Sequence, residues 1–229
     1  MFGQIRNVIR LVLKKTTSIF FKKWYNKYSA KTHTSIIENL TIETFPGVFN
    51  PSFLLSTKTL IRFLKTITLF NKRFLELGCG TGAISVWAAH QGAIVTGTDI
   101  NPKALENARR NAELNNVIIK TKATSLIKNI DLTEFDLVVI NPPYYPNSPK
   151  NLEEQAWFCG EKFEYFSELF SQLERQKFRC DMYMILSEDC AIESIKSIAH
   201  NYSLVCNLTY HSKNIIEHEF IYKIENENA

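Results

Sequence analysis

The chain has 229 residues, of which 45% are hydrophobic and 22% are charged, a composition typical of globular proteins. With only 8 glycines and 7 prolines but 16 phenylalanines, it is neither collagen-like nor fully disordered, and no apolar run approaches the roughly 20 residues of a membrane-spanning helix. The net charge of +4 is uneven, because residues 1–37 carry eight basic side chains and no acidic one. The body of the chain is therefore acidic, which argues against a generally basic nucleic-acid clamp.

Residues 1–38 form a basic segment, and the apolar side chains of its first 30 residues recur at roughly helical spacing, which predicts an amphipathic helix or two. Three uses remain open: packing on its own domain, contact with RNA, or contact with an anionic membrane surface. We treat residues 39–229 as one domain. The cysteines show no metal-ligand spacing, so we expect no metal site and reduced thiols in a cytoplasmic protein; they are Cys79, Cys159, Cys180, Cys190 and Cys206.

Residues 45–51 are rich in turn formers, and residues 52–70 return to helical periodicity. From residue 73 short apolar strands alternate with helices. The predicted strands are residues 74–77, 93–99, 117–119, 135–140, 181–186, 203–210 and 217–224. The predicted helices are residues 83–89, 102–115, about 151–176 and 189–200. This alternation predicts an α/β fold with a mostly parallel sheet covered on both faces, and the last two strands predict an antiparallel hairpin at its edge.

A glycine-rich turn follows the first predicted strand of the sheet. Gly78, Gly80 and Gly82 come directly after residues 74–77 and before a predicted helix. Because glycine has no Cβ, such a turn lets a bulky ligand approach the backbone. Asp99 ends the next strand, where a carboxylate can accept hydrogen bonds from both hydroxyls of a ribose. The pattern predicts a nucleoside cofactor at the carboxyl ends of the strands.

The turn alone leaves two cofactors open. Gly78-x-Gly80-x-x-Ala83 satisfies the dinucleotide fingerprint, so NAD is one candidate. Gly82 adds a third glycine, and Glu76 places a carboxylate two residues before the first. A carboxylate there suits a ligand with an ammonium or sulfonium group and would repel a pyrophosphate.

The segment Glu76–Gly82 resembles motif I of the class I S-adenosylmethionine-dependent methyltransferases, and Asp99-Ile100 resembles their ribose-binding acid and adenine contact. The resemblance implies S-adenosylmethionine as cofactor and a Rossmann-like fold with a seven-stranded sheet. After the third strand the family often places an acid near the adenine amine, whereas this chain offers Ser125. The implied cofactor-binding residues are Glu76, Gly78, Gly80, Gly82, Asp99, Ile100, Ser125 and Asn141.

Asn141-Pro142-Pro143-Tyr144 follows the fourth predicted strand of the domain. An amide or base amine is a poor nucleophile because its lone pair is delocalised, so acceptors for its two N–H groups favour the more reactive pyramidal form. The side-chain oxygen of Asn141 and the carbonyl of Pro142 can act as those acceptors. Tyr144 offers a flat face for stacking on a planar acceptor and for contact with a sulfonium.

This Asn-Pro-Pro-Tyr segment resembles motif IV of the amino-methyltransferases, which include N6-adenine, N2-guanine and release-factor glutamine enzymes. The resemblance implies an N-methyltransferase whose acceptor is an RNA or DNA base or a protein glutamine. Residues 48–60 are similar to the approach segment of the glutamine-methylating branch, with Thr57 as a further cofactor contact. The implied catalytic residues are Asn141, Pro142 and Tyr144, and the implied substrate-binding residues are Pro143, Tyr144 and Trp157.

Two other functions stay open from the sequence. An NAD-dependent oxidoreductase would explain the glycine turn but would leave Asn141–Tyr144 without a role. A non-catalytic module that binds RNA or a membrane would explain the basic segment, and it predicts that substitution of Asn141 has no effect.

Overall fold

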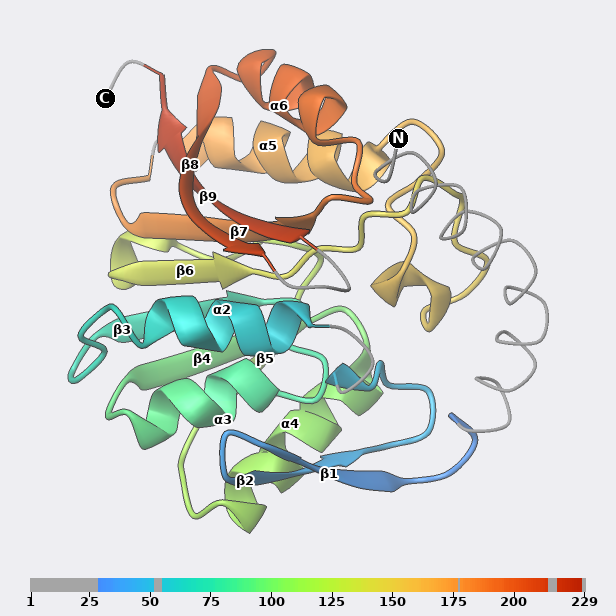
Figure 1. Cartoon of the computed structure of the whole chain (residues 1–229), viewed down its shortest axis with the longest axis vertical. Helices are drawn as coiled ribbons and strands as arrows, with labels where there is room; N and C mark the ends of the chain where they lie inside the picture. Colours follow the sequence, from blue (N-terminus) through green and yellow to red (C-terminus); the bar gives the residue numbers. More distant parts are fainter. Residues whose placement is uncertain (1–28, 52–54, 177, 214–217, 228–229) are drawn as a thin grey trace.

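The computed structural model describes residues 29–51, 55–176, 178–213 and 218–227 (Figure 1). Residues 1–28 of the predicted basic segment therefore lie outside the described residues. The described strands are β1 (His33–Ile37), β2 (Leu40–Thr44), β3 (Arg73–Leu77), β4 (Ile94–Asp99), β5 (Lys120–Ala123), β6 (Leu137–Ile140), β7 (Asp181–Ser187), β8 (Leu204–Lys213) and β9 (His218–Asn226). The described helices are α2 (Ser56–Leu64), α3 (Ala83–His90), α4 (Pro102–Leu114), α5 (Glu164–Gln176) and α6 (Ile192–His200), with short 3₁₀ turns η2 (Leu132–Glu134) and η3 (Glu154–Ala156).

Seven strands form one sheet in the order β5-β4-β3-β6-β7-β9-β8. The first five run parallel, while β9 is antiparallel to both β7 and β8. The predicted mostly parallel α/β sheet with an antiparallel edge hairpin is confirmed. Because β3 lies between β4 and β6, the chain reverses its direction of travel across the sheet at this strand, which is where α/β sheets bind ligands.

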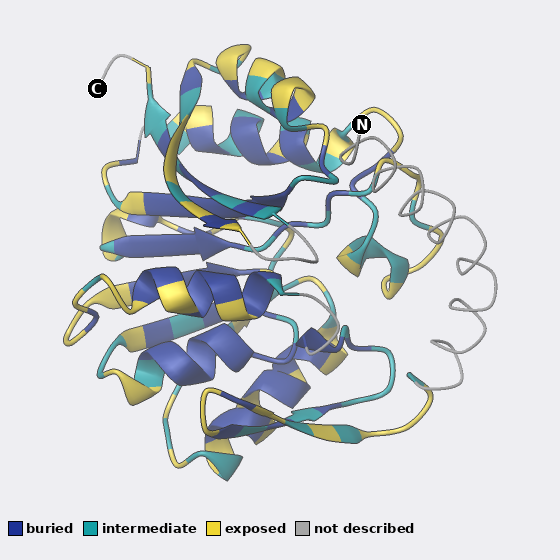
Figure 2. Ribbon diagram, viewed as in Figure 1, coloured by how far each residue is buried: buried dark blue, intermediate teal, exposed yellow. Residues whose placement is uncertain are grey.

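Two apolar cores cover the two faces of the sheet. Alternate residues of each central strand point to opposite faces, so Leu75 packs toward α5 and α6 while Phe74 packs toward α2 and α3. Phe166 and Phe170 of α5 are fully buried, as their spacing predicts. Figure 2 shows the central strands buried on both sides. The sheet is thus a rigid platform for the loops at its edges.

Two predicted elements differ from the structure. The predicted strand 117–119 is wrong, because the Val117 N–H still bonds to Ala112 O at the end of α4 and pairing with β4 begins at Lys120. Ile118 is left 90% exposed. The single helix predicted over 151–176 is also wrong: residues 157–163 are not helical, and only η3 and α5 form.

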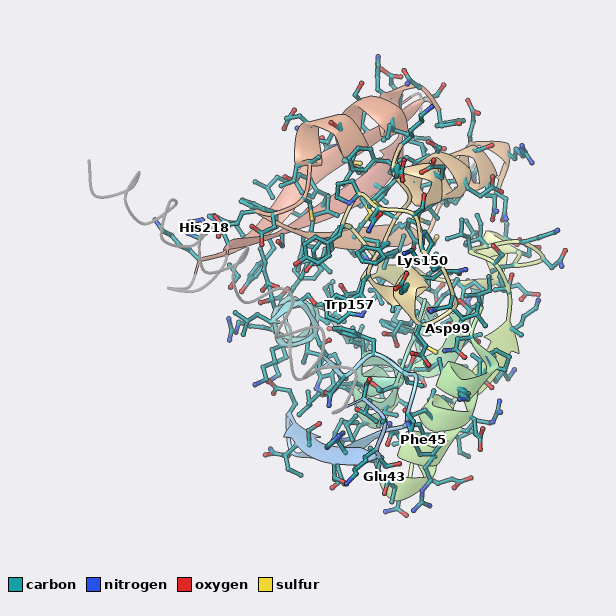
Figure 3. The ribbon with its side chains drawn as sticks, turned by 90° about the vertical axis from the view of Figure 1, so that its right-hand side faces the viewer. Glu43, Phe45, Asp99, Lys150, Trp157 and His218 are labelled. Carbon is teal, nitrogen blue, oxygen red and sulfur yellow. The ribbon has the colours of Figure 1, made fainter. Side chains whose placement is uncertain are left out.

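The β1–β2 hairpin was not predicted, and its turn contains the expected domain boundary after residue 38. The outer edge of β2 bonds to two asparagines of α4 and to a third that caps the C-terminus of this helix, in place of another strand. Asn107, Asn111 and Asn115 each accept a backbone N–H bond from the strand side, at 2.8, 2.8 and 3.0 Å. The asparagines are four residues apart, which is about 6 Å along a helix, and their bonding partners are two residues apart, which is about 6.7 Å along a strand. The two spacings nearly match, so successive asparagines reach successive outward N–H groups. The hairpin leads residues 45–51 toward the carboxyl edge of the sheet; Figure 3 shows Phe45 between Glu43 and Asp99.

Candidate functional site

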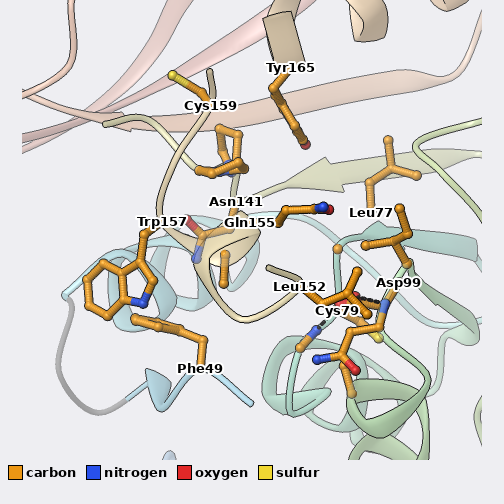
Figure 4. Close-up of a pocket in the computed structure, with 18 of the residues that line it drawn as sticks. Phe49, Leu77, Cys79, Asp99, Asn141, Leu152, Gln155, Trp157, Cys159 and Tyr165 are labelled. Carbon is orange, nitrogen blue, oxygen red and sulfur yellow. Dashed lines mark hydrogen bonds between the residues drawn. The ribbon is translucent and has the colours of Figure 1, made fainter. Parts of the chain in front are cut away.

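A cavity of about 370 Å³ lies at the carboxyl ends of β3, β4, β5 and β6. This size falls in the range of small-molecule sites. Its walls come from the glycine turn after β3, the end of β4, the loop after β6 and residues 47–51 (Figure 4). All of the predicted site residues except Gly82 line this one cavity.

The glycine turn is shaped by backbone conformations that favour glycine. Gly78, Gly80 and Gly82 have φ of 70°, 53° and 73°. A methyl group at Gly78 or Gly80 would meet no other atom within 4 Å, so both backbones face open cavity space. At Gly82 a methyl group would lie 2.7 Å from the Ala108 side chain of α4. Gly82 thus permits close packing of α3 on α4, and its predicted role as a cofactor contact is not supported by the geometry.

The Asp99 side chain links the glycine turn after β3 to the residues that follow β4. Its Oδ2 accepts a hydrogen bond from the Gly80 N–H at 2.9 Å, and its Oδ1 accepts one from the Asn101 N–H at 2.8 Å. Burial raises the pKa of this carboxyl, while the backbone donors act in the opposite direction. A carboxylate offers about four lone-pair positions, so Asp99 can still accept hydrogen bonds from a ribose.

Glu76 is a buried carboxyl on the α3 side of the cavity, with 3% of its surface exposed. Its Oε2 accepts hydrogen bonds from both the backbone N–H (2.8 Å) and the hydroxyl of Ser85. Burial raises its pKa from 4.5 to about 8, with the Ser85 bonds opposing the shift. A cation in the cavity would favour the ionised carboxylate.

The loop after β6 brings the predicted catalytic residues into the cavity. Asn141, Pro142, Pro143 and Tyr144 all line it, and Tyr144 is buried with 4% of its surface exposed. The side-chain N–H of Asn141 donates to the hydroxyl of Ser56 at 3.2 Å. The remaining polar atom of the Asn141 side chain is a carbonyl-type oxygen, the acceptor that the sequence argument requires.

Residues 145–160 fold back over the loop. Tyr145 N–H donates to Trp157 O at 3.1 Å, and Cys159 N–H donates to Tyr145 O at 3.0 Å. Trp157 lines the cavity and contacts Phe49 edge to face, with ring centroids 4.7 Å apart (Figure 4). The two rings, from segments 108 residues apart in sequence, form one aromatic wall.

The remaining residues predicted to contact the cofactor also line the cavity. Ile100 is 44% exposed and, like Ser125 and Thr57, lines the cavity wall. Asp131, the first acidic residue after the predicted strand 117–119, lies in a separate surface depression, where its carboxylate accepts the Thr133 N–H at 2.9 Å. The chain therefore offers the Ser125 segment, and not Asp131, on the side of the cavity next to Asp99.

The lining residues to which the sequence assigned no role include Phe49, Gln155 and Tyr165. Figure 4 shows the Gln155 and Tyr165 side chains extending into the cavity. Burial raises the pKa of the Tyr165 phenol, which keeps it a hydroxyl donor. Tyr165 follows the positive-φ residue Phe163 and the Gly160 turn, which redirect the chain toward the site. The only signal in the sequence was the aromatic density after Tyr144.

Within the described ranges, no group of three or more His, Cys, Asp or Glu side chains is arranged to hold a metal ion. No helix in that part of the chain has the length and apolar character needed to cross a bilayer.

Residues 39–157 match the family model described as the methyltransferase small domain. The chain is 37% identical over 114 residues to ribosomal RNA small subunit methyltransferase C of Haemophilus influenzae, covering 48% of this chain and 34% of that protein. It is 39% identical over 90 residues to a release factor glutamine methyltransferase of Flavobacterium psychrophilum, covering 38% and 32%. The chain spans between about a third and about half of the length of the curated relatives it matches.

Solved structures share the fold. The Mtq2–Trm112 complex of E. cuniculi, responsible for methylation of the eRF1 translation termination factor, superposes with a TM-score of 0.60 at 22% identity, over 79% of this chain and 99% of that one. The T. thermophilus 16S rRNA N2 G1207 methyltransferase in complex with AdoMet and guanosine superposes with a TM-score of 0.59 at 16% identity, over 84% and 50%.

Proposed function

Because this chain belongs to the methyltransferase small domain family, we propose that it is an S-adenosylmethionine-dependent N-methyltransferase acting on a planar nitrogen. The observation that carries the proposal is the placement of Asn141–Tyr144 and the glycine turn on one cavity. The family match and the relatives above are methyltransferases, so the comparisons give no support to an NAD-dependent oxidoreductase or a non-catalytic binding module.

The cavity fits the proposed cofactor on three observations. Open space next to Gly78 and Gly80 leaves room for a ligand against the backbone. Asp99 presents two carboxylate oxygens for a ribose, and Ile100 presents an exposed apolar side chain for an adenine face. Glu76 provides a buried carboxyl for a positively charged group. When bound, S-adenosylmethionine supplies a methyl group on a positively charged sulfur.

The residues of this chain prepare the acceptor nitrogen. The Asn141 side-chain oxygen and the Pro142 carbonyl accept its two N–H groups, which localises the nitrogen lone pair. The rings of Tyr144 and Trp157 pack against the faces of the planar acceptor group. Pro143 restricts the conformation of the loop that carries Asn141 and Tyr144. The rate then comes mainly from orientation for in-line transfer, since no strong base is required.

The charges of the cavity favour a protein glutamine amide as the acceptor. Its described lining contains five acidic side chains and no Lys, Arg or His side chain; besides Glu76, whose pKa is raised to about 8, these are Asp99, Glu153, Glu164 and Glu168. Such a lining repels the phosphates that flank an RNA base. A base amine is the second candidate, favoured by the similarity to ribosomal RNA methyltransferase C and by the basic residues 1–38, which we propose as an RNA contact.

The test is transfer of a tritiated methyl group into cell extract, followed by division of the label into RNase-sensitive and protease-sensitive fractions. We expect protease-sensitive label, with exhaustive enzymatic digestion releasing N5-methylglutamine. Asn141→Ala is expected to lower kcat by at least 100-fold while calorimetric affinity for S-adenosylhomocysteine stays within a few-fold. Full activity of Asn141→Ala would contradict the proposed mechanism, and RNase-sensitive label would select the base amine instead.

We also propose a cytoplasmic location, which is supported by the cysteines. All five are free thiols, and three of them, Cys79, Cys159 and Cys190, are buried. Free thiols of this kind suit a reducing compartment.

A further inference from the structure

The side chain of Asn141 is held by a residue from a distant part of the chain. Its Nδ2 donates to the Oγ of Ser56 at 3.2 Å, although the two residues are 85 positions apart. Ser56 begins α2 and has 3% of its surface exposed. Among the described residues, the bond to Ser56 is the only hydrogen bond that the Asn141 side chain makes. One end of the amide is thus anchored in the protein, and the other remains available to a ligand.

The orientation of this amide decides what it can do in the proposed reaction. An amide nitrogen is only a donor and an amide oxygen only an acceptor. With Nδ2 on Ser56, the oxygen can accept an N–H from the acceptor nitrogen. If the amide turned by 180°, its own N–H groups would oppose those of the acceptor, and stabilisation of the pyramidal nitrogen would be lost.

The helix that carries Ser56 is itself attached to the sheet one turn after Ser56. Thr59, one helical turn later, donates its hydroxyl proton to the buried carboxylate of Glu219 on β9. Glu219 is paired with Ser187 at the end of β7 in the sheet. The hydrogen bonds therefore attach the first turn of α2 to the central sheet, so the Ser56 hydroxyl sits at a defined position beside the loop after β6.

We propose that Ser56 is a positioning residue, whose hydroxyl holds the Asn141 amide with its oxygen toward the methyl acceptor. The inference rests on the proposed function, because it assigns Asn141 the role of a hydrogen-bond acceptor in methyl transfer. It adds a second residue of α2 to the site, next to Thr57, and it gives the buried Thr59–Glu219 contact a role in keeping that residue in place.

The test compares Ser56→Ala with Ser171→Ala. Ser171 is a matched control because its hydroxyl also accepts an N–H bond at 3.2 Å, from Arg175, and it does not line the cavity. We expect Ser56→Ala to lower kcat about 10-fold, with S-adenosylhomocysteine affinity unchanged within two-fold. Ser171→Ala should retain the wild-type kcat.

Non-additivity separates positioning from a general structural effect. In the Asn141→Ala background, Ser56→Ala should cause no further loss of kcat, because the group it positions is already absent. Equal fold losses in both backgrounds, or a fall in kcat that matches a fall in thermal stability, would overturn the inference.

A spectroscopic measurement does not depend on turnover. In ¹⁵N-labelled protein, the Asn141 side-chain NH₂ pair is identified by its absence from the spectrum of Asn141→Ala. We expect Ser56→Ala to shift that pair and to increase its fast motion, and Ser171→Ala to leave it unchanged. An equally ordered Asn141 amide in Ser56→Ala would overturn the inference even if the protein transferred no methyl group, whereas failure of the wild-type protein to bind S-adenosylhomocysteine would count against the proposed function itself.

Discussion

The Gly80 backbone N–H donates to the Asp99 carboxylate at 2.9 Å, so the turn after β3 and the end of β4 are joined directly across 19 residues of sequence. The same carboxylate accepts the Asn101 N–H at 2.8 Å. One side chain therefore sets the shape of the glycine turn and also presents the oxygens expected to bind a ribose.

Replacing Asp99 by asparagine should weaken cofactor binding. An asparagine has a single side-chain oxygen, so an NH₂ group would face one of the two backbone N–H donors and one ribose hydroxyl. We expect calorimetric affinity for S-adenosylhomocysteine to fall by about 10- to 100-fold. Asp131→Asn is the control, because Asp131 also accepts a backbone N–H, from Thr133 at 2.9 Å, but lies outside the cavity. Equal losses in both variants would count against the ribose role.

The raised pKa of Glu76 should make the stability of the protein depend on pH. Its pKa in the folded protein is raised by burial from 4.5 to about 8. Between these values the folded state holds a proton that the unfolded state has released, so the free energy of unfolding falls as pH rises through this window. Glu76→Gln keeps an acceptor for Ser85 without the charge. We expect urea titrations to show that the variant gains stability relative to wild type from pH 5 to pH 9; a constant difference would refute the assignment.

We expect the Glu76 carboxyl to release a proton when the cofactor binds. A sulfonium beside Glu76 favours the carboxylate, so binding of S-adenosylmethionine near pH 7 should release up to one proton, and affinity should rise toward pH 8. Calorimetry in buffers of different ionisation enthalpy measures this release. Glu76→Gln should abolish it.

Gly78 and Gly82 offer a matched pair of substitutions, since their φ values are 70° and 73°. Alanine at either position costs about 1–2 kcal/mol for the left-handed conformation. At Gly82 the added methyl group would also press on Ala108 at 2.7 Å, which adds about 1–3 kcal/mol of overpacking. Gly78→Ala should therefore mainly weaken S-adenosylhomocysteine binding, while Gly82→Ala should mainly lower Tm. Similar Tm values for the two variants would contradict the packing role.

Trp157 should contribute to acceptor binding. Its ring forms the aromatic wall with Phe49, at a centroid distance of 4.7 Å. We expect Trp157→Ala to raise KM for the methyl acceptor about 10-fold, through the loss of stacking and buried area, with S-adenosylhomocysteine affinity unchanged. Phe70, which is 67% exposed and outside the cavity, supplies the control Phe70→Ala. A loss of cofactor affinity in Trp157→Ala would place the ring on the donor side.

The local features of the site could be predicted because they depend on short segments. The turn was predictable because glycine favours the left-handed conformations found at positions 78, 80 and 82. Asp99 was predictable as a ligand-binding residue because it ends a strand of the sheet. The two prolines that follow Asn141 predict a rigid loop in the same way. The edge strand β5 was misplaced by three residues because Lys120–Ala123 is polar, and an exposed edge strand needs no apolar pattern.

The sequence by itself therefore determined the fold class and the chemical groups at the strand ends, since hydrophobic periodicity and turn residues act over a few positions. Tertiary structure alone decided that Gly82 packs on Ala108, that Ser56 holds Asn141 and that the asparagines of α4 complete the edge of β2. Each of these pairs lies 26 to 85 residues apart in sequence. Such contacts depend on how helices and loops meet in three dimensions, and no local pattern of residue types encodes that meeting.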